Sequence, residues 1–497
     1  MDTLVSRFWR LKRWQSGLLL LLVGVIIAFG MAPLDAWYLA LPGWGVALAL
    51  LTCAPGRRGA FLGAIMVGLG YFGFTLRWLV DPFLVDAATW GWVAPFAVSI
   101  MALGAALFWA VGAGLAHLAA PGRLSALVLS LTLVEVLRST IFTGFPWGLI
   151  GHALIPTPLA QLSAFGGPHL LTLTLLGVAA GIVRLTRRYW TGAIPLVVAT
   201  IAWPLLVPPV TGDPVDAPVI RIVQPNAPQS EKWDPARNRV FFDRMMAYTQ
   251  AGPRPDLIVW PETAVPTLLD YAQPELEAMS EAAQGVPLVT GINRSENGLY
   301  YNAMILLGRA GRVTASYDKA HLVPFGEYVP FGEVLKGLGL RGLAASEGGG
   351  FAKGPVPQPL IELPGIGKAR ALICYEGIFA EEIATPQRPR VLLMITNDAW
   401  FGKGAGPTQH LAQARLRAIE QGLPMVRSAN TGISAMIDPY GRIRASIPLD
   451  KAGYVDAPLP DPLPARVYGR WGDWPVIIFI VLGLGVLSVN NRRSHKL

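Results

Sequence analysis

The sequence predicts a helical membrane bundle joined to a mixed α/β domain, and three observations lead to this fold class. Hydrophobic residues make up 53% of the 497 residues, charged residues only 15%, and the mean hydropathy is +0.44. This composition is too apolar for a wholly soluble protein and too mixed for a membrane bundle alone. Apolar runs about as long as a membrane span recur in residues 1–209. The segment 210–470 instead alternates short β-like runs with helical stretches.

Eight apolar runs are each near the roughly 20 residues that a membrane-spanning helix needs. They cover residues 16–31, 36–54, 59–77, 92–118, 124–141, 159–183, 192–208 and 474–490. The first run is followed closely by others, so we interpret it as a retained anchor and not as a cleaved signal peptide. We therefore expect a membrane domain of seven spans at 1–209, and an eighth span with a short tail at 471–497.

Basic residues lie beside these apolar runs. The groups are Arg7, Arg10, Lys12 and Arg13, then Arg57 and Arg58, then Arg123, then Arg184, Arg187 and Arg188, and finally Arg492, Arg493 and Lys496. If the N-terminus is cytoplasmic, the alternation of spans puts every group on the cytoplasmic side, as the positive-inside rule requires. The net charge of +9 thus needs no nucleic-acid partner. This topology predicts cytoplasmic termini and a domain at 210–470 outside the cytoplasm.

The predicted membrane domain contains a pair of ionisable residues and several tryptophans near the ends of apolar runs. Glu135 and Arg138 are three residues apart on one helical face, so each could partner the other. Either a structural ion pair or a functional role would explain ionisable residues there. Trp147 in "FPWGLIGH" is interpreted, like other tryptophans near the ends of apolar runs, as an anchor at the membrane interface.

The α/β segment begins after the Pro-rich linker "VPPVTGDPVDAP". Its β-like runs are "VIRIVQ", "DLIVWPE", "VPLVTGI", "NAMILL", "ARALICYE" and "VLLMITND". Helical stretches at 235–249 and 275–284 lie between them, which predicts mixed α/β layering. None of the 6 histidines falls in a zinc-ligand spacing, and "GLGLRG" at 337–342 lacks the strand that a dinucleotide site needs. We expect neither a metal nor a cofactor.

Three stretches each place an ionisable residue at or after the end of a β-like run, where sites form in α/β sheets. They are "LIVWPETAVP" with Glu262, "SYDKAHLVPFGEYVP" with Lys319 and "LICYEGIF" with Cys374. A thiol attacks as the thiolate, so Glu262 could take its proton while Lys319 stabilises the anion. Lys319 and the backbone N–H of Tyr375 could also hold an oxyanion. Taken alone, each residue has an ordinary structural explanation.

These stretches resemble the motifs of the nitrilase, or carbon-nitrogen hydrolase, superfamily, whose Glu-Lys-Cys triad lies in three such motifs. The resemblance implies a triad of Glu262, Lys319 and Cys374 in an αββα sandwich. It also implies that Glu327 in "FGEYVP" orients the lysine. Glu376, two residues beyond the cysteine, could position a second substrate, position a loop, or only share a strand face.

A nitrilase-like domain placed before the last of eight spans resembles the apolipoprotein N-acyltransferase family, and "VQPNAPQSEKW" and "FPWGLIGH" fit that family as well. The resemblance implies transfer of a fatty acyl chain from a phospholipid to the α-amino group of a diacylglyceryl-cysteine apolipoprotein, through a thioester on Cys374. It implies a bacterial inner-membrane enzyme with a periplasmic catalytic domain, and we expect a monomer. The Gly-rich stretch 334–354 is expected to be a lid or a disordered insert.

Two other classes of protein share some of these sequence features. A membrane-tethered amidase acting on small C–N substrates would use the same triad, but a soluble substrate would not require seven preceding spans. A transporter or receptor would need charged or broken helices along a path, or internal repeats. The sequence offers little of either beyond Glu135 and Arg138.

Overall fold

The chain forms two compact units in the computed structural model, one of Met1–Pro209 with Ala465–Leu497 and one of Val210–Pro464. The structure describes every residue except 1, 210–211, 213, 331–349, 358 and 495–497. Most of the stretch expected to form a lid, and all of "GLGLRG", therefore lie outside the described residues. The two units are described separately below.

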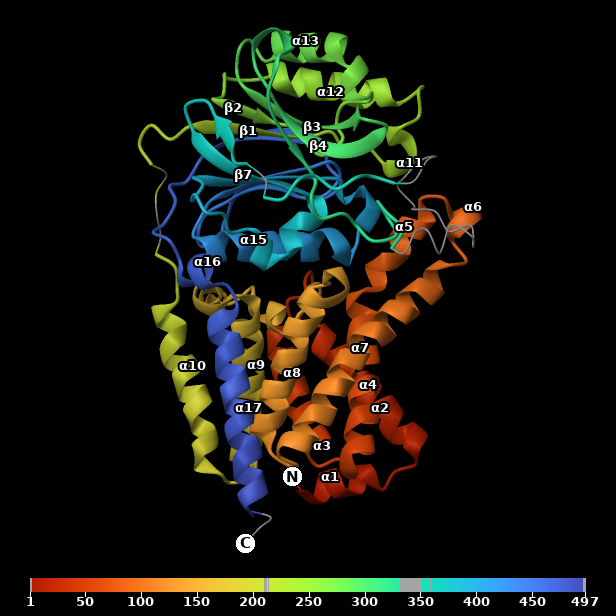
Figure 1. Cartoon of the computed structure of the whole chain (residues 1–497), viewed down its shortest axis with the longest axis vertical. Coiled ribbons are helices and arrows are strands. Elements are labelled where there is room, and N and C mark those ends of the chain that lie inside the picture. Colours follow the sequence, from red (N-terminus) through yellow and green to blue (C-terminus); the bar gives the residue numbers. More distant parts are fainter. Residues whose placement is uncertain (1, 210–211, 213, 331–349, 358, 495–497) are drawn as a thin grey trace. The chain divides into compact units, whose positions relative to one another are not determined.

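The first unit is helical, and its long helices follow the apolar runs of the sequence to within a few residues (Figure 1). They are α2 (Arg13–Ala28), α3 (Trp37–Thr52), α4 (Gly56–Thr75), α7 (Ala94–Ala119), α8 (Leu124–Thr140), α9 (Ser163–Thr186), α10 (Ala193–Leu205) and α17 (Trp474–Ser494). Short helices accompany them: α1 (Asp2–Trp9), α5 (Asp81–Leu84), α6 (Ala87–Trp90) and α16 (Val467–Trp471). Among the described residues, five helices are long and apolar enough to cross a membrane, and α2, α3 and α10 are shorter apolar helices.

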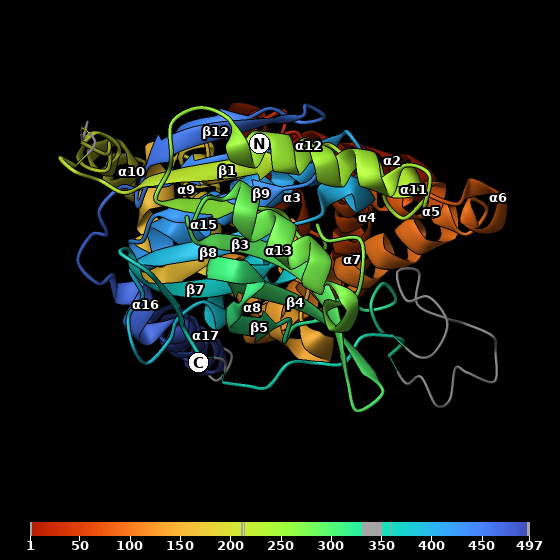
Figure 2. The same ribbon diagram turned by 90° about the horizontal axis from the view of Figure 1, so that it is seen from above.

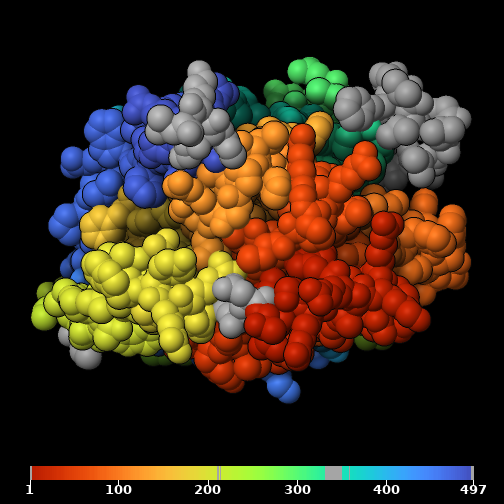
Figure 3. Space-filling view, turned by 90° about the horizontal axis from the view of Figure 1, so that it is seen from below, coloured from red at the N-terminus to blue at the C-terminus, as the bar shows by residue number. Residues whose placement is uncertain are grey.

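The outer faces of these helices are apolar. Large side chains that remain exposed include Leu18, Leu22, Ile26, Leu103, Leu107, Val111, Val197, Ile201, Phe479 and Leu482. An apolar surface of this extent is unfavourable in water but is what lipid tails require. The start of α1 and the end of α17 lie at the same end of the unit (Figure 1). Figure 3 looks onto this end, where red N-terminal residues lie beside the yellow segment leading into α10.

Glu135 and Arg138 form a buried pair on α8, with Arg138 Nε 3.0 Å from Glu135 Oε1. Trp109 of α7 donates from Nε1 to Glu135 Oε1 at 2.9 Å, and Arg138 Nη1 donates to the carbonyl of Trp147 at 2.9 Å. The pair thus connects two helices and the loop after α8. The role of interfacial anchor predicted for Trp147 is wrong, because Arg138 holds the backbone of this loop and the Trp147 ring, 1% exposed, packs against Trp78 inside the unit.

The described residues of the second unit form two six-stranded sheets. The first has the order β12-β1-β2-β3-β4-β5, with β1 (Val219–Gln224), β2 (Leu257–Val259), β3 (Leu288–Glu296), β4 (Leu299–Leu307), β5 (Val313–Asp318) and β12 (Gly453–Pro458). The second has the order β11-β10-β9-β8-β7-β6, with β6 (Ile361–Leu363), β7 (Gly367–Ile373), β8 (Val391–Thr396), β9 (Met425–Ala429), β10 (Ser434–Ile437) and β11 (Ile443–Ile447). The predicted β-like runs lie in β1, β2, β3, β4, β7 and β8.

The two sheets pack face to face through one apolar core, in which Ile222 and Val259 of the first sheet join Ile373 and Leu393 of the second. The helices α12 (Asn238–Gln250) and α13 (Gln273–Ala282) lie across the outer face of the first sheet (Figure 2). The helix α15 (Ala405–Gln421) covers the outer face of the second. Figure 1 shows these four layers in order, which is the αββα arrangement.

Parallel pairing at the centre of each sheet positions the candidate residues. Strands β1, β2 and β3 run parallel, as do β7, β8 and β9. Because these strands are covered on both faces, most of their residues are apolar, and the candidate polar residues follow their carboxyl ends. Glu262 follows β2, Cys374 follows β7 and Asn397 follows β8. The carboxyl ends of the parallel strands therefore bring these three candidate residues to one side of the unit.

Candidate functional site

Cys374 occupies a sharp corner at the end of β7. It begins the 3-10 turn η9 (Cys374–Ile378) with a φ of +51°, in the left-handed region. A non-glycine residue in this region costs about 1–3 kcal/mol and persists only when its surroundings hold it there. The Ile373 N–H donates to Glu376 Oε2 at 2.7 Å on one side, and the Cys374 carbonyl lies 3.2 Å from His410 Nε2 on the other.

The Glu262 carboxylate is held by donors from both sheets. Asn302 Nδ2 of β4 donates to Oε1 at 2.7 Å, and the N–H of Asn397 after β8 donates to Oε2 at 2.7 Å. The loop also packs closely on β3: a Cβ on Gly291 would lie 2.4 Å from the Thr263 nitrogen and 2.6 Å from the Glu262 Cα. Glycine is therefore required at this crossing, and each carboxylate oxygen has a fixed direction.

Lys319 follows β5 and is 1% exposed. Its Nζ lies 2.8 Å from Glu327 Oε1 and 3.8 Å from Glu262 Oε1. Burial disfavours the ammonium charge, but the carboxylates of Glu327 and Glu262 outweigh it and hold the pKa of Lys319 above its usual value. Glu327 is fixed in turn by the Val323 N–H, which donates to its Oε2 at 2.8 Å. Lys319 is thus a permanent buried cation.

The Cys374 thiol responds electrostatically to both of these groups. Burial raises the pKa of Cys374, the negative charge of Glu262 raises it further, and Lys319 partly opposes them. The resting side chain is therefore a neutral thiol, which is a poor nucleophile. The structure thus brings together the three residues that the sequence predicts, and the thiol needs a proton acceptor before it can react.

Glu376 accepts hydrogen bonds from two segments of this unit. Its Oε1 accepts from the Tyr317 hydroxyl at 2.9 Å, the Ala320 N–H at 2.8 Å and the His321 N–H at 3.2 Å. Its Oε2 accepts from the Ile373 N–H. The carboxylate therefore joins the end of β7 to the loop after Lys319, which favours loop positioning among the roles left open for Glu376. The ring of the adjacent Tyr375 packs against His321 and Phe379.

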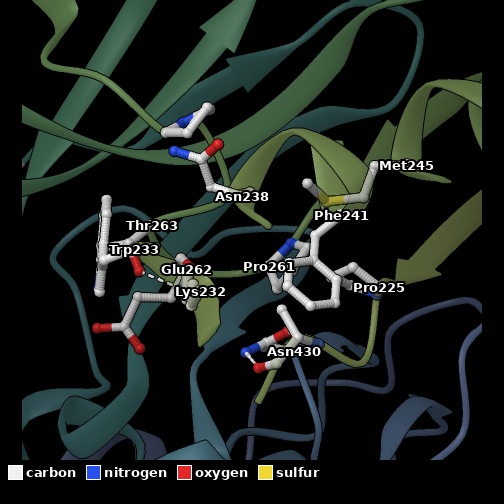
Figure 4. A pocket seen from close by; sticks show the side chains of 13 residues that line it. Pro225, Lys232, Trp233, Asn238, Phe241, Met245, Pro261, Glu262, Thr263 and Asn430 are labelled. Carbon is white, nitrogen blue, oxygen red and sulfur yellow. Dashed lines mark hydrogen bonds between the residues drawn. The ribbon is translucent and has the colours of Figure 1, made fainter. Parts of the chain in front are cut away.

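Sequence reasoning missed Lys232, which belongs to the short helix α11 (Gln229–Lys232). Its Nζ donates to the Glu262 carbonyl at 3.0 Å and to Thr263 Oγ1 at 2.5 Å. Burial lowers the pKa of Lys232 to about 8, against weaker opposition from Glu262 and Cys374. Lys232 also lines a cavity beside Glu262 (Figure 4), with apolar walls that include Phe241.

Asn302 was missed as well, although the sequence carries a signal for it. It is the single strongly polar residue in the apolar run "NAMILL", and Nδ2 approaches both Glu262 Oε1 and Glu327 Oε1, the latter at 3.2 Å. A buried amide that bridges two carboxylates sets their separation. Within the described ranges, no cluster of three or more His, Cys, Asp or Glu side chains could hold a metal ion.

Comparison with known proteins agrees with this architecture. Residues 220–461 match the carbon-nitrogen hydrolase family, and residues 23–181 match the apolipoprotein N-acyltransferase N-terminal domain. An apolipoprotein N-acyltransferase of Brucella suis biovar 1 is 37% identical over 99% of this chain and 99% of its own. This chain belongs to the apolipoprotein N-acyltransferase family. The resemblance predicted from the motifs is confirmed.

Other similar proteins include a member of the apolipoprotein N-acyltransferase family from Rhodopseudomonas palustris, 36% identical over 96% of each chain. A solved amidase of Nesterenkonia sp. is 19% identical, with a TM-score of 0.38, over 54% of this chain and 98% of that chain. Membership of the apolipoprotein N-acyltransferase family identifies this chain as an acyl-transferring enzyme, and its apolar helices fit a multi-pass membrane protein.

Proposed function

We propose that this chain transfers a fatty acyl chain from a phospholipid to the N-terminal α-amino group of diacylglyceryl-cysteine apolipoproteins, in two steps through a thioester on Cys374. The observation that carries the proposal is the grouping of Cys374, Glu262 and Lys319. A neutral thiol at a strained strand end lies within the electrostatic reach of the oriented carboxylate of Glu262 and the buried cation of Lys319. An ester and an amine are readily connected through such a covalent intermediate.

In the first step Glu262 takes the proton of the Cys374 thiol while Sγ attacks the ester carbonyl of the phospholipid. The oxyanion that forms is stabilised by Lys319 Nζ and the Tyr375 N–H. When the intermediate collapses, the C–O bond breaks and Glu262 gives its proton to the leaving lysophospholipid oxygen. The acyl chain is then held on Sγ and Glu262 is again a carboxylate.

In the second step the α-amino group of the apolipoprotein attacks the thioester. Glu262 takes one proton from the attacking nitrogen, the same two donors hold the oxyanion, and the C–S bond breaks. The leaving thiolate recovers the proton from Glu262, which restores the resting thiol. The products are the N-acylated apolipoprotein and the free enzyme.

The two carboxylates near Lys319 suit different tasks. Glu327 lies at 2.8 Å and makes a close ion pair, whereas Glu262 lies at 3.8 Å. One Glu262 oxygen accepts a hydrogen bond from Asn302 and the other accepts one from Asn397, and a carboxylate oxygen has two lone pairs. Glu262 therefore retains acceptor capacity for a proton, while Glu327 keeps Lys319 charged and in place.

We further propose that the helical unit is a membrane domain with eight spans, that the unit 210–464 is catalytic and periplasmic, and that both termini are cytoplasmic. The basic groups beside the apolar helices support this topology. A bacterial inner membrane would supply both lipid-anchored substrates by lateral diffusion. Extracting acyl chains into water, at roughly 0.8 kcal/mol per CH₂, would then be unnecessary. We propose a monomer.

The decisive experiment is to trap the acyl-enzyme. A Cys53→Ser variant, whose single remaining cysteine is Cys374, would be incubated with a phospholipid of defined chain length and its intact mass measured. We expect a mass increase of one acyl chain, lost when a diacylglyceryl-cysteine peptide is added and recovered as N-acyl peptide. The matched Cys53→Ser/Cys374→Ala variant should gain nothing. Absence of the adduct, with turnover of small amides, would show an amidase instead.

A further inference from the structure

A fully buried polar cluster lies behind Cys374 and takes no part in the steps above. Asp398 begins the turn η11 (Asp398–Phe401) after β8, His410 comes from α15 and Arg427 from β9. Asp398 Oδ1 lies 2.9 Å from His410 Nδ1, and Oδ2 accepts from Arg427 Nη2 at 2.7 Å. Thr396 Oγ1 also donates to Asp398 Oδ1 at 2.8 Å. The cluster ends at the nucleophile, because His410 Nε2 is 3.2 Å from the Cys374 carbonyl oxygen.

The contacts of His410 determine where its proton lies. A carbonyl oxygen can only accept, so Nε2 must carry a proton to bond the Cys374 carbonyl. On the other side of the ring, Nδ1 either donates to Asp398 or accepts from Arg427 Nη2, which lies 3.1 Å away. Both arrangements leave the proton on Nε2. In the opposite tautomer the lone pair of Nε2 would face the Cys374 carbonyl oxygen, and the two would repel each other.

The packing around the cluster favours a single orientation of its side chains. The Phe401 ring meets the His410 ring edge-on at 5.5 Å. A Cβ on Gly432 would lie 2.2 Å from Asp398 Oδ2, so only glycine leaves room for this carboxylate. Burial would raise the pKa of Asp398, but Arg427 and His410 outweigh it and hold this pKa below its usual value. Asp398 is therefore a fixed carboxylate that orients the ring.

Holding the Cys374 carbonyl also fixes the neighbouring N–H. The peptide bond between Cys374 and Tyr375 is planar and trans, so its C=O and its N–H point in opposite directions. With the carbonyl directed toward His410, the Tyr375 N–H points away from His410, in the opposite direction within the peptide plane. The same hydrogen bond resists relaxation of Cys374 out of its strained φ of +51°.

We propose that His410, oriented by Asp398 and Arg427, is a positioning residue that directs the Tyr375 N–H toward the oxyanion of acyl transfer. The proposal rests on the proposed function and deepens it, because it names the group that sets the oxyanion donor. His410 touches neither substrate nor the reacting atoms. Its effect on the reaction passes through one peptide plane.

The test compares His410→Gln with His410→Asn in the full-length Cys53→Ser enzyme. The glutamine Nε2 can reach the place of the imidazole Nε2 and donate to the Cys374 carbonyl, whereas the shorter asparagine amide serves only Asp398. Two rates would be measured: single-turnover acylation of Cys374 by phospholipid, and its alkylation by iodoacetamide. Alkylation displaces iodide in one step and forms no oxyanion, so it reports the nucleophile alone.

We expect His410→Asn to slow acylation about 10²–10³-fold, the usual effect of losing one oxyanion donor, while alkylation changes by no more than a few-fold. His410→Gln should recover most of the acylation rate. Equal loss of both rates would overturn the proposal, because the nucleophile itself would have moved. Acylation at the wild-type rate in His410→Asn, or no recovery in His410→Gln, would overturn it too.

Two controls separate other causes of failure. If thermal melting shows that His410→Asn is unfolded, Asp398→Asn would be measured in its place, because asparagine keeps the shape of the carboxylate. Asp398→Asn should slow acylation more than alkylation. Equal effects on the two rates would overturn the proposal. The Cys53→Ser enzyme, without a change at His410, tests the proposed function separately. If its Cys374 is alkylated but never acylated by phospholipid, the proposed function fails, and the positioning role fails with it.

Discussion

Cys374 is 6% exposed, and the surroundings that keep its thiol protonated are the same ones that would activate it in the proposed mechanism. Burial and the charge of Glu262 both raise its pKa, so the thiolate forms only when a proton moves to Glu262. In the proposed mechanism the Cys374 thiol and the Glu262 carboxylate therefore work as one unit. Replacing Glu262 should therefore make the Cys374 thiol more acidic and yet make acyl transfer slower.

Glu262→Gln removes the negative charge beside Cys374 while keeping the shape of the side chain. We expect the pKa of Cys374 to fall, so that the pH dependence of its alkylation moves to lower pH. Acyl transfer should nevertheless fall about 10²–10⁴-fold, since an amide cannot act as the base. Iodoacetamide alkylation followed by mass from pH 6 to pH 10 measures the first effect. An unchanged alkylation profile would contradict the assigned influence of Glu262 on the thiol.

Lys232 gives a second prediction at this scale, concerning stability. Its folded pKa of about 8 lies below the usual 10.5, so between these values the unfolded chain binds the proton and the folded chain does not. Stability therefore rises with pH across this window, by up to about 3 kcal/mol. Lys232→Met should abolish this dependence. The melting temperature of the wild type should rise relative to Lys232→Met from pH 8 to pH 10; a constant difference would contradict the prediction.

The sequence could single out Glu262, Lys319 and Cys374, which the structure brings together, because each follows a β-like run within a long motif. It could not predict the contacts of Lys232 or Asn302, since these join residues 30 and 40 positions apart in the chain. The role of Glu376 depends on the loop after Lys319, 55 positions away. Local patterns show which side chains are chemically capable, and only the fold shows which of them meet.

At the scale of elements, the buried pair on α8 shows how a polar contact can fix helices in an apolar unit. Glu135 receives donors from Trp109, from Arg138 and from the Ile150 N–H, and so connects α7, α8 and the following loop. Breaking a buried pair by removing one partner leaves an uncompensated charge and costs about 3–5 kcal/mol, whereas removing both costs less. These contacts support the structural explanation of the pair.

A double-mutant cycle tests this explanation. Glu135→Leu and Arg138→Leu should each destabilise the detergent-solubilised protein by about 3–5 kcal/mol, and the double variant by clearly less than their sum. Thermal unfolding of the four proteins provides the measurement, with acyl-transfer activity at low temperature as a control for function. Additive losses of stability would show that the two residues do not act as a pair.

Helices and strands differed in how far the sequence could predict them. The long helices follow contiguous apolar runs, so their bounds could be read locally. The pairing of β12 with β1 joins segments more than 200 residues apart, and no local pattern indicates it. For Trp147 a local pattern was present but led to the wrong role. Its position near the end of an apolar run was correct, but the Arg138 contact that buries its loop depends on tertiary structure.

For the whole molecule, the native Cys53 offers a test of the proposed topology. Cys53 is exposed at the C-terminal end of α3, close to Arg57 and Arg58, and Arg187 Nη2 donates to its Sγ at 3.0 Å. If these basic groups are cytoplasmic, a membrane-impermeant maleimide should label Cys53 in inverted membrane vesicles and not in intact spheroplasts. A Cys374→Ala background removes the other thiol. Labelling from the spheroplast exterior would reverse the topology.

The protonated state of Cys374 also has a consequence for redox chemistry. Oxidation by peroxide and exchange with disulfides both begin from the thiolate. The proposed periplasmic location would expose this unit to oxidants, and a buried neutral thiol reacts with them slowly. We therefore expect peroxide to oxidise Cys53 well before Cys374 in the purified protein, as peptide mass analysis would show. The arrangement that makes the nucleophile depend on Glu262 would then also keep it reduced between turnovers.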